Sequence, residues 1–401
     1  MSERVFITGY GIITSIGNNA EENFQSLVNK KVGFGPLEFL DTVHKQTLPA
    51  CEIKLNEKSL CKLAGVRSNE GFTRTSLLGL IALKEAIRHA QLSDEEVASS
   101  GLISATTTGG IREFEQYFDG LMNPSAEGDF VQFTDTATSG EHCDKIAERL
   151  GIRRYLGTIS TACSSSANSL MHGAQMIKHK KLDRVICGGS EALSKFTVNG
   201  FNTLMILDRK HCRPFDVSRN GLNLGEAAAY IVLESESVVT KNSKKVIAEV
   251  KGYGNANDAF HQTASSPDGA GAYNAMHQAL STAGILPSEV DYINAHGTAT
   301  ENNDISEGLG IKRLFNETVP AFSSTKPYTG HTLAAAGSVE TVYCLMSLQH
   351  GMLWPNVNYK NIMPELGIEP VKDLSNRNLK YVLSNSFGFG GNTSSILLAA
   401  V

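Results

Sequence analysis

The sequence has 401 residues, of which 41% are hydrophobic and 19% charged, and its formal net charge is −5. This composition is typical of a soluble globular protein with a deep core, and the acidic balance argues against a nucleic-acid partner held by a basic surface. No apolar run approaches the roughly 18 residues that cross a bilayer, and the first residues lack the apolar stretch of a signal peptide. We therefore expect a cytoplasmic protein without membrane contact.

Predicted strands alternate with amphipathic helices along the chain, which favours an α/β fold. The strands expected in the first part are RVFITGYG (4–11), GLISATT (101–107), GTISTA (157–162), RVICGGS (184–190) and AAAYIVLES (227–235). Those expected in the second part are VIAEVKGYG (246–254), DYINAHG (291–297), AFSST (321–325), YVLSNSFG (381–388) and SSILLAAV (394–401). Apolar residues at three- and four-residue steps predict helices over 70–91, 142–150, 164–180, 271–284, 303–315 and 333–350.

The two parts of the chain resemble one another. RVFITGYGI near the start is similar to VIAEVKGYGNA at 246–256, and each part closes on a strand that follows a glycine-containing segment. The polar stretch around residues 238–246 is the only plausible boundary, so we divide the chain into residues 1–240 and 241–401. Two copies of one layout, packed face to face, would bring strand ends from both halves into one cleft.

A cysteine stands where a predicted strand meets a predicted helix, in GTISTACSSSANS (157–169). Unpaired N–H groups in the first turn of a helix make the local potential positive, which favours a thiolate at Cys163. A small buried hydrophobe is the equally weighted alternative for a single free cysteine. The seven cysteines are scattered without a C-x-x-C pair, which favours reduced thiols over disulfides or a metal site.

The second half supplies two histidines among small residues at predicted loop–helix junctions. His296 lies in NAHGTATENND (294–304), and His331 lies in SSTKPYTGHTLAAAGSVE (323–340) together with Lys326 and Glu340. Small neighbours let backbone and substrate approach closely. The glycine-rich run SNSFGFGGNTS (384–394) does not fit G-x-G-x-x-G and precedes a strand, so we reject a dinucleotide site. It is better interpreted as a source of backbone N–H donors with an aromatic gate.

These segments, in this order, resemble the elongating β-ketoacyl-[acyl-carrier-protein] synthases. The resemblance extends to CRPFDVSRNGLNLGEAAA (212–229), DAFHQTASSPDGAGA (258–272) and SGLISATTTGGI (100–111), and covers essentially the whole chain. It implies a thiolase-like fold of two pseudo-repeated halves in five layers, α-β-α-β-α, usually as a homodimer. It also implies acyl transfer without a bound cofactor or metal, on substrates carried by the 4′-phosphopantetheine of acyl carrier protein, in fatty acid biosynthesis.

The resemblance assigns a role to each site residue. Cys163 holds the acyl group as a thioester, and its backbone N–H and that of Phe389 form the oxyanion hole for the acyl carbonyl. His296 and His331 donate through Nε2–H to the enolate oxygen that develops as carbon dioxide leaves. Lys326, Glu340 and Asp304 support the site, as does Glu307, without touching the reacting carbon. Synthases primed by coenzyme A would have asparagine at position 331, and a non-catalytic chain-length factor would lack the cysteine.

Departures from the family pattern bear on substrate and partner. Thr108 stands where a bulky aliphatic often lines the acyl pocket, and Asn220 and Asn223 alter the usual Asp-Gly-Phe-Val pattern. These changes support an alternative, a ketosynthase subunit of a specialised polyene or polyketide pathway, paired with a chain-length factor. The basic pair Arg209 and Lys210 is predicted to dock the acidic carrier protein; the alternative is an ordinary solvated loop.

Overall fold

The computed structural model describes residues 3–123, 125, 132–316 and 318–401 of the chain. Ten strands form one sheet in the order β3-β2-β4-β5-β1-β6-β12-β11-β7-β8. The first half contributes β1 (Val5–Thr14), β2 (Gly101–Ala105), β3 (Tyr155–Ile159), β4 (Arg184–Glu191) and β5 (Ala227–Ser235). The second half contributes β6 (Ala248–Asn257), β7 (Tyr292–Asn294), β8 (Ala321–Ser323), β11 (Tyr381–Phe387) and β12 (Asn392–Ala399). A separate short ribbon joins β9 (Met352–Leu353) and β10 (Ser375–Asn376).

Strand pairing repeats between the halves. In the first half β1 pairs with β5 and β5 with β4, both antiparallel, whereas β4, β2 and β3 run parallel. In the second half β6 pairs with β12 and β12 with β11, both antiparallel, whereas β11, β7 and β8 run parallel. Among the described residues, the strand pairing that joins the two five-stranded units is that of Phe6 and Ile7 with Glu249 and Ala248. The weak internal similarity of the sequence therefore reflects a duplicated topology.

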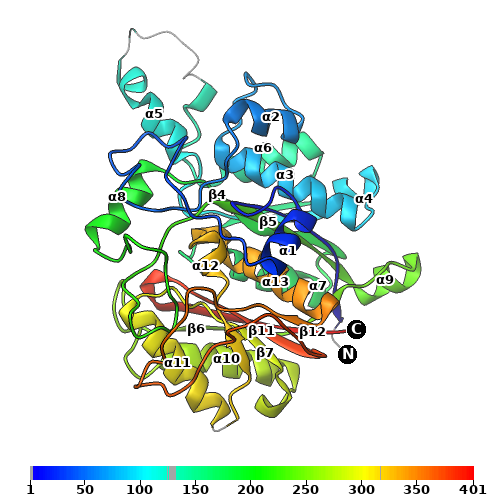
Figure 1. The fold of residues 1–401 in the computed structure, drawn as a ribbon. Coiled ribbons are helices and arrows are strands. Elements are labelled where there is room, and N and C mark those ends of the chain that lie inside the picture. Colours follow the sequence, from blue (N-terminus) through cyan, green and yellow to red (C-terminus); the bar gives the residue numbers. More distant parts are fainter. Residues whose placement is uncertain (1–2, 124, 126–131, 317) are drawn as a thin grey trace.

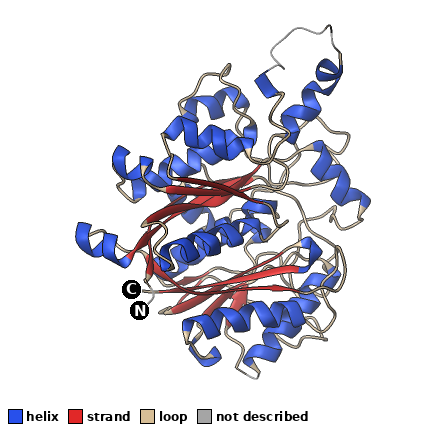
Figure 2. Ribbon diagram, turned by 180° about the vertical axis from the view of Figure 1, so that it is seen from behind, coloured by secondary structure: helices blue, strands red, loops and turns tan. Residues whose placement is uncertain are grey.

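Helices form three layers around these two sheet halves, as Figures 1 and 2 show. The outer layer on the first half contains α2 (Glu57–Ala64), α3 (Arg74–His89) and α6 (Glu141–Leu150), and that on the second contains α10 (Ala270–Ala283) and α11 (Glu301–Phe315). Between the sheets lie α7 (Ser165–Lys178) and α13 (Ala336–His350). The remaining helices are α1 (Ala20–Val28), α4 (Asp94–Ala98), α5 (Ile111–Met122), α8 (Lys195–Thr203), α9 (Glu236–Asn242) and the single turn α12 (Lys326–Thr329). The thiolase-like five-layer expectation is confirmed.

The two central helices pack closely because their contact is made of small residues. A Cβ atom added at Gly337 of α13 would lie 2.6 Å from the backbone nitrogen of Ala167 on α7 and 2.9 Å from its Cβ. Buried apolar side chains from both sheets surround this pair, among them Val185, Ile231 and Ile396. A helix that is apolar on all sides is stable only when it is enclosed, and α13 is buried from Ala336 through Ser347. The central layer therefore fixes the start of α7, where Cys163 lies.

The long periodic helices agree with the sequence prediction to within a few residues. The segments 142–150, 164–180 and 271–284 correspond to α6, α7 and α10, and 70–91 contains α3. The prediction missed α5 and α8, which follow β2 and β4, and also the shorter helices α1, α2, α4, α9 and α12. No helix among the described residues is long and apolar enough to cross a membrane.

Candidate active site

Cys163 lies in the tight turn that connects β3 to α7. Ala162, just before it, has a φ of +53°, an uncommon conformation for a residue with a side chain. The Cys163 side chain is only 5% exposed, and the backbone N–H of Phe389 hydrogen bonds to its sulfur. Burial raises the pKa of this thiol to about 12, although the Lys326 ammonium and the Phe389 N–H act in the opposite direction. The expected thiolate is thus opposed by burial, and the free thiol is protonated at neutral pH.

His296 follows β7 and is held in place by Glu307 of α11 and by Lys326 of α12. Its backbone N–H donates to Oε1 of Glu307 on α11 over 2.9 Å, and that of Gly297 donates to Oε2 over 2.8 Å. Nζ of Lys326 lies 3.2 Å from Nδ1 of His296 and donates to its carbonyl oxygen over 2.6 Å. Because an ammonium can only donate, Nδ1 accepts and the ring proton resides on Nε2.

Lys326 and Glu340 form a buried ion pair beside His296. The two side chains are 2% and 3% exposed, and Nζ of Lys326 donates to Oε1 of Glu340. With the carbonyl oxygen and Nδ1 of His296, this contact uses all three N–H groups of the ammonium. Burial raises the pKa of Glu340 to about 7, against the attraction of Lys326.

His331, like His296, carries its ring proton on Nε2. Its Nδ1 accepts the backbone N–H of Leu333 over 3.1 Å, and the backbone N–H of His331 donates to the carbonyl oxygen of Asn223 over 2.7 Å. The rings of His296 and His331 lie 5.3 Å apart, edge to face. Burial, followed by the Lys326 charge, lowers the pKa of both histidines well below the ordinary 6.5, so both are neutral Nε2–H donors.

The glycine-rich loop after β11 completes the enclosure. Gly390 has a φ of +81°, which glycine adopts without strain, and its N–H donates to the carbonyl oxygen of Gln262 over 2.7 Å. The ring of Phe389 stacks on that of Phe201 of α8, with 5.7 Å between centroids and 19° between planes. The conformation of Phe389, and of the N–H that reaches Cys163, therefore depends on α8.

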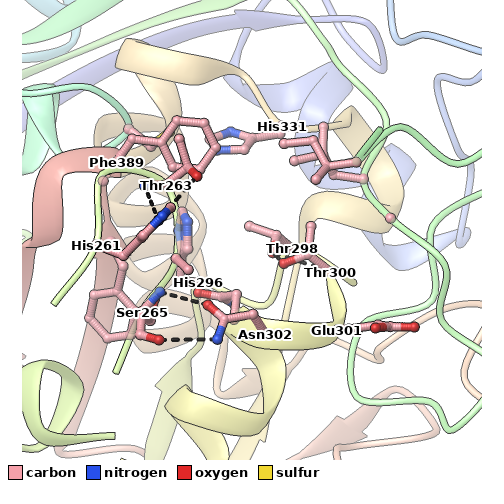
Figure 3. A pocket seen from close by; sticks show the side chains of 18 of the residues that line it. His261, Thr263, Ser265, His296, Thr298, Thr300, Glu301, Asn302, His331 and Phe389 are labelled. Carbon is pink, nitrogen blue, oxygen red and sulfur yellow. Dashed lines mark hydrogen bonds between the residues drawn. The ribbon is translucent and has the colours of Figure 1, made fainter. Parts of the chain in front are cut away.

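Cys163, His296, His331 and Phe389 line one cavity of about 410 Å³. Figure 3 shows both imidazoles and the Phe389 ring directed into it, with Thr298, Thr300 and Asn302 on the side of α11. The cavity wall also includes Met205, Asn220 and Leu222 from the first half. Strand ends of both halves thus contribute to a single cleft, as their packing requires.

Other predicted residues lie around this cavity rather than in it. Asp304 is buried and accepts the backbone N–H groups of Phe215 over 2.7 Å and Ala299 over 3.1 Å, so it holds the loop after His296. Thr108 is half-buried, and its hydroxyl donates to Oε1 of Glu191 over 2.7 Å. It is not among the residues that line the cavity.

Arg209 and Lys210 are exposed in the turn after α8. Asn223 donates to the carbonyl oxygens of Asp208 and Lys210 and accepts from Cys212, so this departure from the family pattern shapes that turn. Within the described part of the chain, no group of three or more His, Cys, Asp or Glu side chains could hold a metal ion.

Sequence reasoning missed Phe201 and Asn385. Phe201 belongs to a helix that the pattern did not reveal. Asn385 donates its Nδ2–H to Glu307 over 3.1 Å and thereby supports the carboxylate beneath His296. The only available signal was the position of Asn385 inside the glycine-rich run 384–394, three residues before Gly388.

Comparisons with known proteins agree with this geometry. The family described as beta-ketoacyl synthase, N-terminal domain, matches residues 2–238, and its C-terminal domain matches residues 247–360. A protein of Vibrio cholerae named 3-oxoacyl-[acyl-carrier-protein] synthase 2 is 31% identical over 98% of both chains. One of the same name from Staphylococcus aureus is 30% identical over 98% of this chain and 97% of its own.

Two solved structures are similar along the whole chain. The first, titled as the ishigamide ketosynthase/chain length factor, has a TM-score of 0.92 at 27% identity and 100% coverage of both chains. The second, from Xenorhabdus doucetiae, is a ketosynthase in complex with its chain length factor. It has a TM-score of 0.83 at 28% identity, covering 100% of this chain and 98% of the other.

Proposed function

Since the chain belongs to the β-ketoacyl synthase family, we propose that it joins an acyl group held on Cys163 to a malonyl group on acyl carrier protein, in fatty acid biosynthesis. The reaction is a decarboxylative Claisen condensation, and the enzyme is a carbon–carbon bond-forming acyltransferase. One observation carries the assignment: a buried thiol and two neutral Nε2–H donors meet in one cavity.

In the first half-reaction Cys163 sulfur attacks the acyl thioester. The negative charge on the carbonyl oxygen is stabilised by the backbone N–H groups of Cys163 and Phe389. Because the free thiol is protonated, its proton passes to the departing carrier sulfur, so that acyl-Cys163 and free carrier thiol are formed. The fixed turn at Ala162 holds the sulfur at the start of α7 for this attack.

In the second half-reaction malonyl-carrier loses carbon dioxide. The enolate oxygen that develops accepts hydrogen bonds from Nε2 of His296 and of His331, and a fixed donor of this kind contributes about 3–4 kcal/mol to a transition state. The enolate carbon then attacks the acyl carbonyl on Cys163. The thiolate leaves and takes up a proton, and the β-ketoacyl product remains on the carrier. Lys326 and Glu340 act as positioning residues because they fix the His296 tautomer.

The test separates the two half-reactions. The parent protein and the His296→Ala and His331→Ala variants are incubated with acyl-carrier and then with malonyl-carrier. Intact mass should reveal an acyl group on all three, whereas carbon dioxide release should fall about 100- to 1000-fold in the variants. Cys163→Ala should remain unacylated. Release of carbon dioxide at the parent rate by a histidine variant would refute its role as a donor.

A second candidate is favoured by the two similar ketosynthase structures, whose titles include a chain length factor. In that case the chain is the ketosynthase subunit of a polyene or polyketide pathway and pairs with such a partner rather than with itself. Sedimentation of the purified chain and the products formed from a panel of acyl-carrier proteins discriminate between the two. A catalytically active homodimer that makes saturated-chain precursors would support the fatty acid assignment.

We also propose that the protein is located in the cytoplasm. The seven cysteines are all free and buried, which is compatible with a reducing compartment.

A further inference from the structure

Asn392 stands at the point where the glycine-rich loop enters β12. Its carbonyl oxygen accepts the backbone N–H of Gly388 over 2.8 Å, so the loop that contains Phe389 is closed at its base. The neighbours Gly391 and Thr393 line the catalytic cavity, whereas Asn392 is half-buried and is not part of that lining. Its side chain can therefore act on the loop without touching a bound substrate.

The side chain of Asn392 connects this loop to the start of α7. Its Oδ1 lies 2.6 Å from Oγ of Ser164, the residue after Cys163, and accepts the serine hydroxyl. The same oxygen accepts Nδ2–H of Asn168 over 2.8 Å, and Asn168 also donates to Oγ1 of Thr161 over 2.8 Å. Thr161 and Ser164 flank the nucleophile on its two sides. One amide oxygen is thus linked to both sides of the turn that bears the nucleophile.

The glycine-rich loop packs directly on this turn. A Cβ atom added at Gly388 would lie 2.8 Å from the carbonyl oxygen of Thr161 and 3.1 Å from Oγ of Ser164. Because this contact has no room for an apolar side chain, hydrogen bonds rather than side-chain packing fix the distance between loop and turn. The backbone N–H groups of Cys163 and Phe389 lie one on the turn and one on the loop. The same hydrogen bonds therefore fix the separation of these two donors.

We propose that Asn392 is a positioning residue for the oxyanion hole, since it holds the N–H groups of Cys163 and Phe389 at the separation that the acyl carbonyl requires. This inference rests on the proposed function, because it takes acyl transfer to Cys163 as the reaction. Fixed donors stabilise a transition state because they need no reorganisation, and a displacement of about 1 Å can cost about 100-fold in rate. Loss of the Asn392 amide should therefore slow the chemistry at the acyl carbonyl without weakening substrate binding.

The decisive variant is Asn392→Ala, which keeps the backbone bond to Gly388 and removes the amide. Because the position is half-buried, water can satisfy the donors that lose their acceptor, and the fold is retained. Rapid mixing with octanoyl-N-acetylcysteamine, a thioester without carrier, followed by intact mass gives kcat and KM for acylation of Cys163. The kcat should fall about tenfold, whereas the KM should stay at the parent value.

Ser164→Ala tests the same link from its other end. This variant alone should also slow acylation, and Asn392→Ala/Ser164→Ala should be no slower than Asn392→Ala, since both changes remove the same hydrogen bond. Effects that multiply in the double variant would show that the two residues act independently and would overturn the proposal.

Ser394 on β12 supplies the matched control within the same group of polar side chains. Its hydroxyl donates to Oδ1 of Asn168 over 2.9 Å and lies 3.4 Å from Oδ1 of Asn392, too far for more than a weak contact. Ser394→Ala should lower the melting temperature about as much as Asn392→Ala and leave kcat for acylation at the parent value. An equal fall of kcat in both variants, or a higher KM with the parent kcat in Asn392→Ala, would overturn the proposal. A change in sedimentation of Asn392→Ala would assign the amide to subunit assembly and would also overturn it.

The infrared carbonyl stretch of the acyl enzyme measures the oxyanion hole directly and separates failure of this inference from failure of the proposed function. Hydrogen bonds to the carbonyl oxygen lower the frequency of isotopically labelled octanoyl-Cys163, so Asn392→Ala should raise it towards that of a free thioester; an unchanged frequency would overturn the proposal. If Asn392→Ala shows the slower acylation and the raised frequency but the parent condenses no malonyl-carrier, the positioning role stands and the proposed reaction fails. If the parent condenses malonyl-carrier and Asn392→Ala is acylated at the parent rate, the reaction stands and the positioning role fails.

Discussion

Replacing Lys326 by methionine should separate decarboxylation from acyl transfer. The Lys326 ammonium makes three hydrogen bonds, to the carbonyl oxygen and Nδ1 of His296 and to Glu340. Methionine retains the length of the side chain and removes the charge and all three donors. Nothing then dictates which nitrogen of His296 carries the proton. His331 keeps its own Nδ1 partner, Leu333, and remains a donor.

The magnitude follows from counting donors. One of two oxyanion donors is lost, which lowers the rate of decarboxylation about 100- to 1000-fold. Removing one partner of a buried ion pair costs about 3–5 kcal/mol in the free energy of unfolding. Burial already raises the pKa of Glu340 to about 7, and loss of Lys326, whose charge lowers it, should leave the carboxyl protonated at neutral pH.

A double variant distinguishes a catalytic effect from a loss of stability. Replacing a buried ion pair by apolar residues of similar volume is often neutral for stability. Lys326→Met/Glu340→Leu should therefore unfold in urea near the parent midpoint and still release labelled carbon dioxide from malonyl-carrier at the rate of the single variant. Cys163 should be acylated in both. Recovery of decarboxylation in the double variant, or a parent-like rate in Lys326→Met, would refute the assignment of Lys326 to His296.

Three further predictions concern individual side chains. Iodoacetamide should alkylate Cys163 first among the seven cysteines because it alone lines the cavity; peptide mass spectra that show Cys61 modified earlier would contradict this. Burial lowers the pKa of His142 from 6.5 to about 4, so stability is full above pH 6.5 and falls as the pH drops toward 4. His142→Gln should abolish about 1 kcal/mol of the decrease in unfolding free energy between pH 7.5 and 5.5, measured in urea, whereas an unchanged slope would show that His142 is not the group. Phe201→Leu should slow acylation of Cys163 about fivefold by releasing Phe389, with Phe201→Tyr as the control that keeps the stacked ring and the parent rate.

The sequence predicted the central features of the fold because they leave strong local patterns. α7 and α10 carry an apolar stripe at helical spacing, and the paired halves repeat their strand motifs. α8 escaped prediction because its pattern is weak: Phe196 and Leu204 are exposed, while Thr197 is buried. Helix propensity reflects only the local preference of the chain. The position of α8 depends on tertiary contacts, among them the hydrogen bond that the backbone N–H of Lys195 donates to the Glu115 carboxylate.

Part of the site was likewise visible in the sequence and part was not. Glycine and threonine beside His296 and His331 mark positions where other groups approach closely, and such positions can be predicted from the residue types alone. The protonation state of the Cys163 thiol cannot be predicted from the sequence, because it depends on how far the fold excludes water from the side chain. The sequence suggests a thiolate from the helix N-terminus, whereas burial raises the pKa to about 12. Nor does spacing along the chain reveal that Phe389 rests on Phe201.

Thr108 illustrates how a structure sharpens a substrate prediction. The resemblance assigns this position to the floor of the acyl pocket, where threonine would make the floor either deeper or more polar than an aliphatic residue. The hydroxyl of Thr108 donates to Glu191, as do those of Thr106 and Thr107. The hydroxyl is therefore engaged, so only the methyl group would meet an acyl chain that extended beyond the cavity, which Thr108 itself does not line.

The variants Thr108→Val and Thr108→Ile test this interpretation, since valine keeps the volume and isoleucine adds one methylene. Each methylene excluded from an apolar site weakens binding by about 0.8 kcal/mol, or about fourfold. Thr108→Ile should therefore reduce acylation of Cys163 about fourfold for the longest acyl chains that the parent accepts and leave short chains unaffected. Thr108→Val should retain the parent profile across a panel of acyl-carrier proteins read by intact mass. Equal loss in both variants would show that the hydroxyl rather than the volume matters, and a parent-like profile in Thr108→Ile would remove this residue from the pocket.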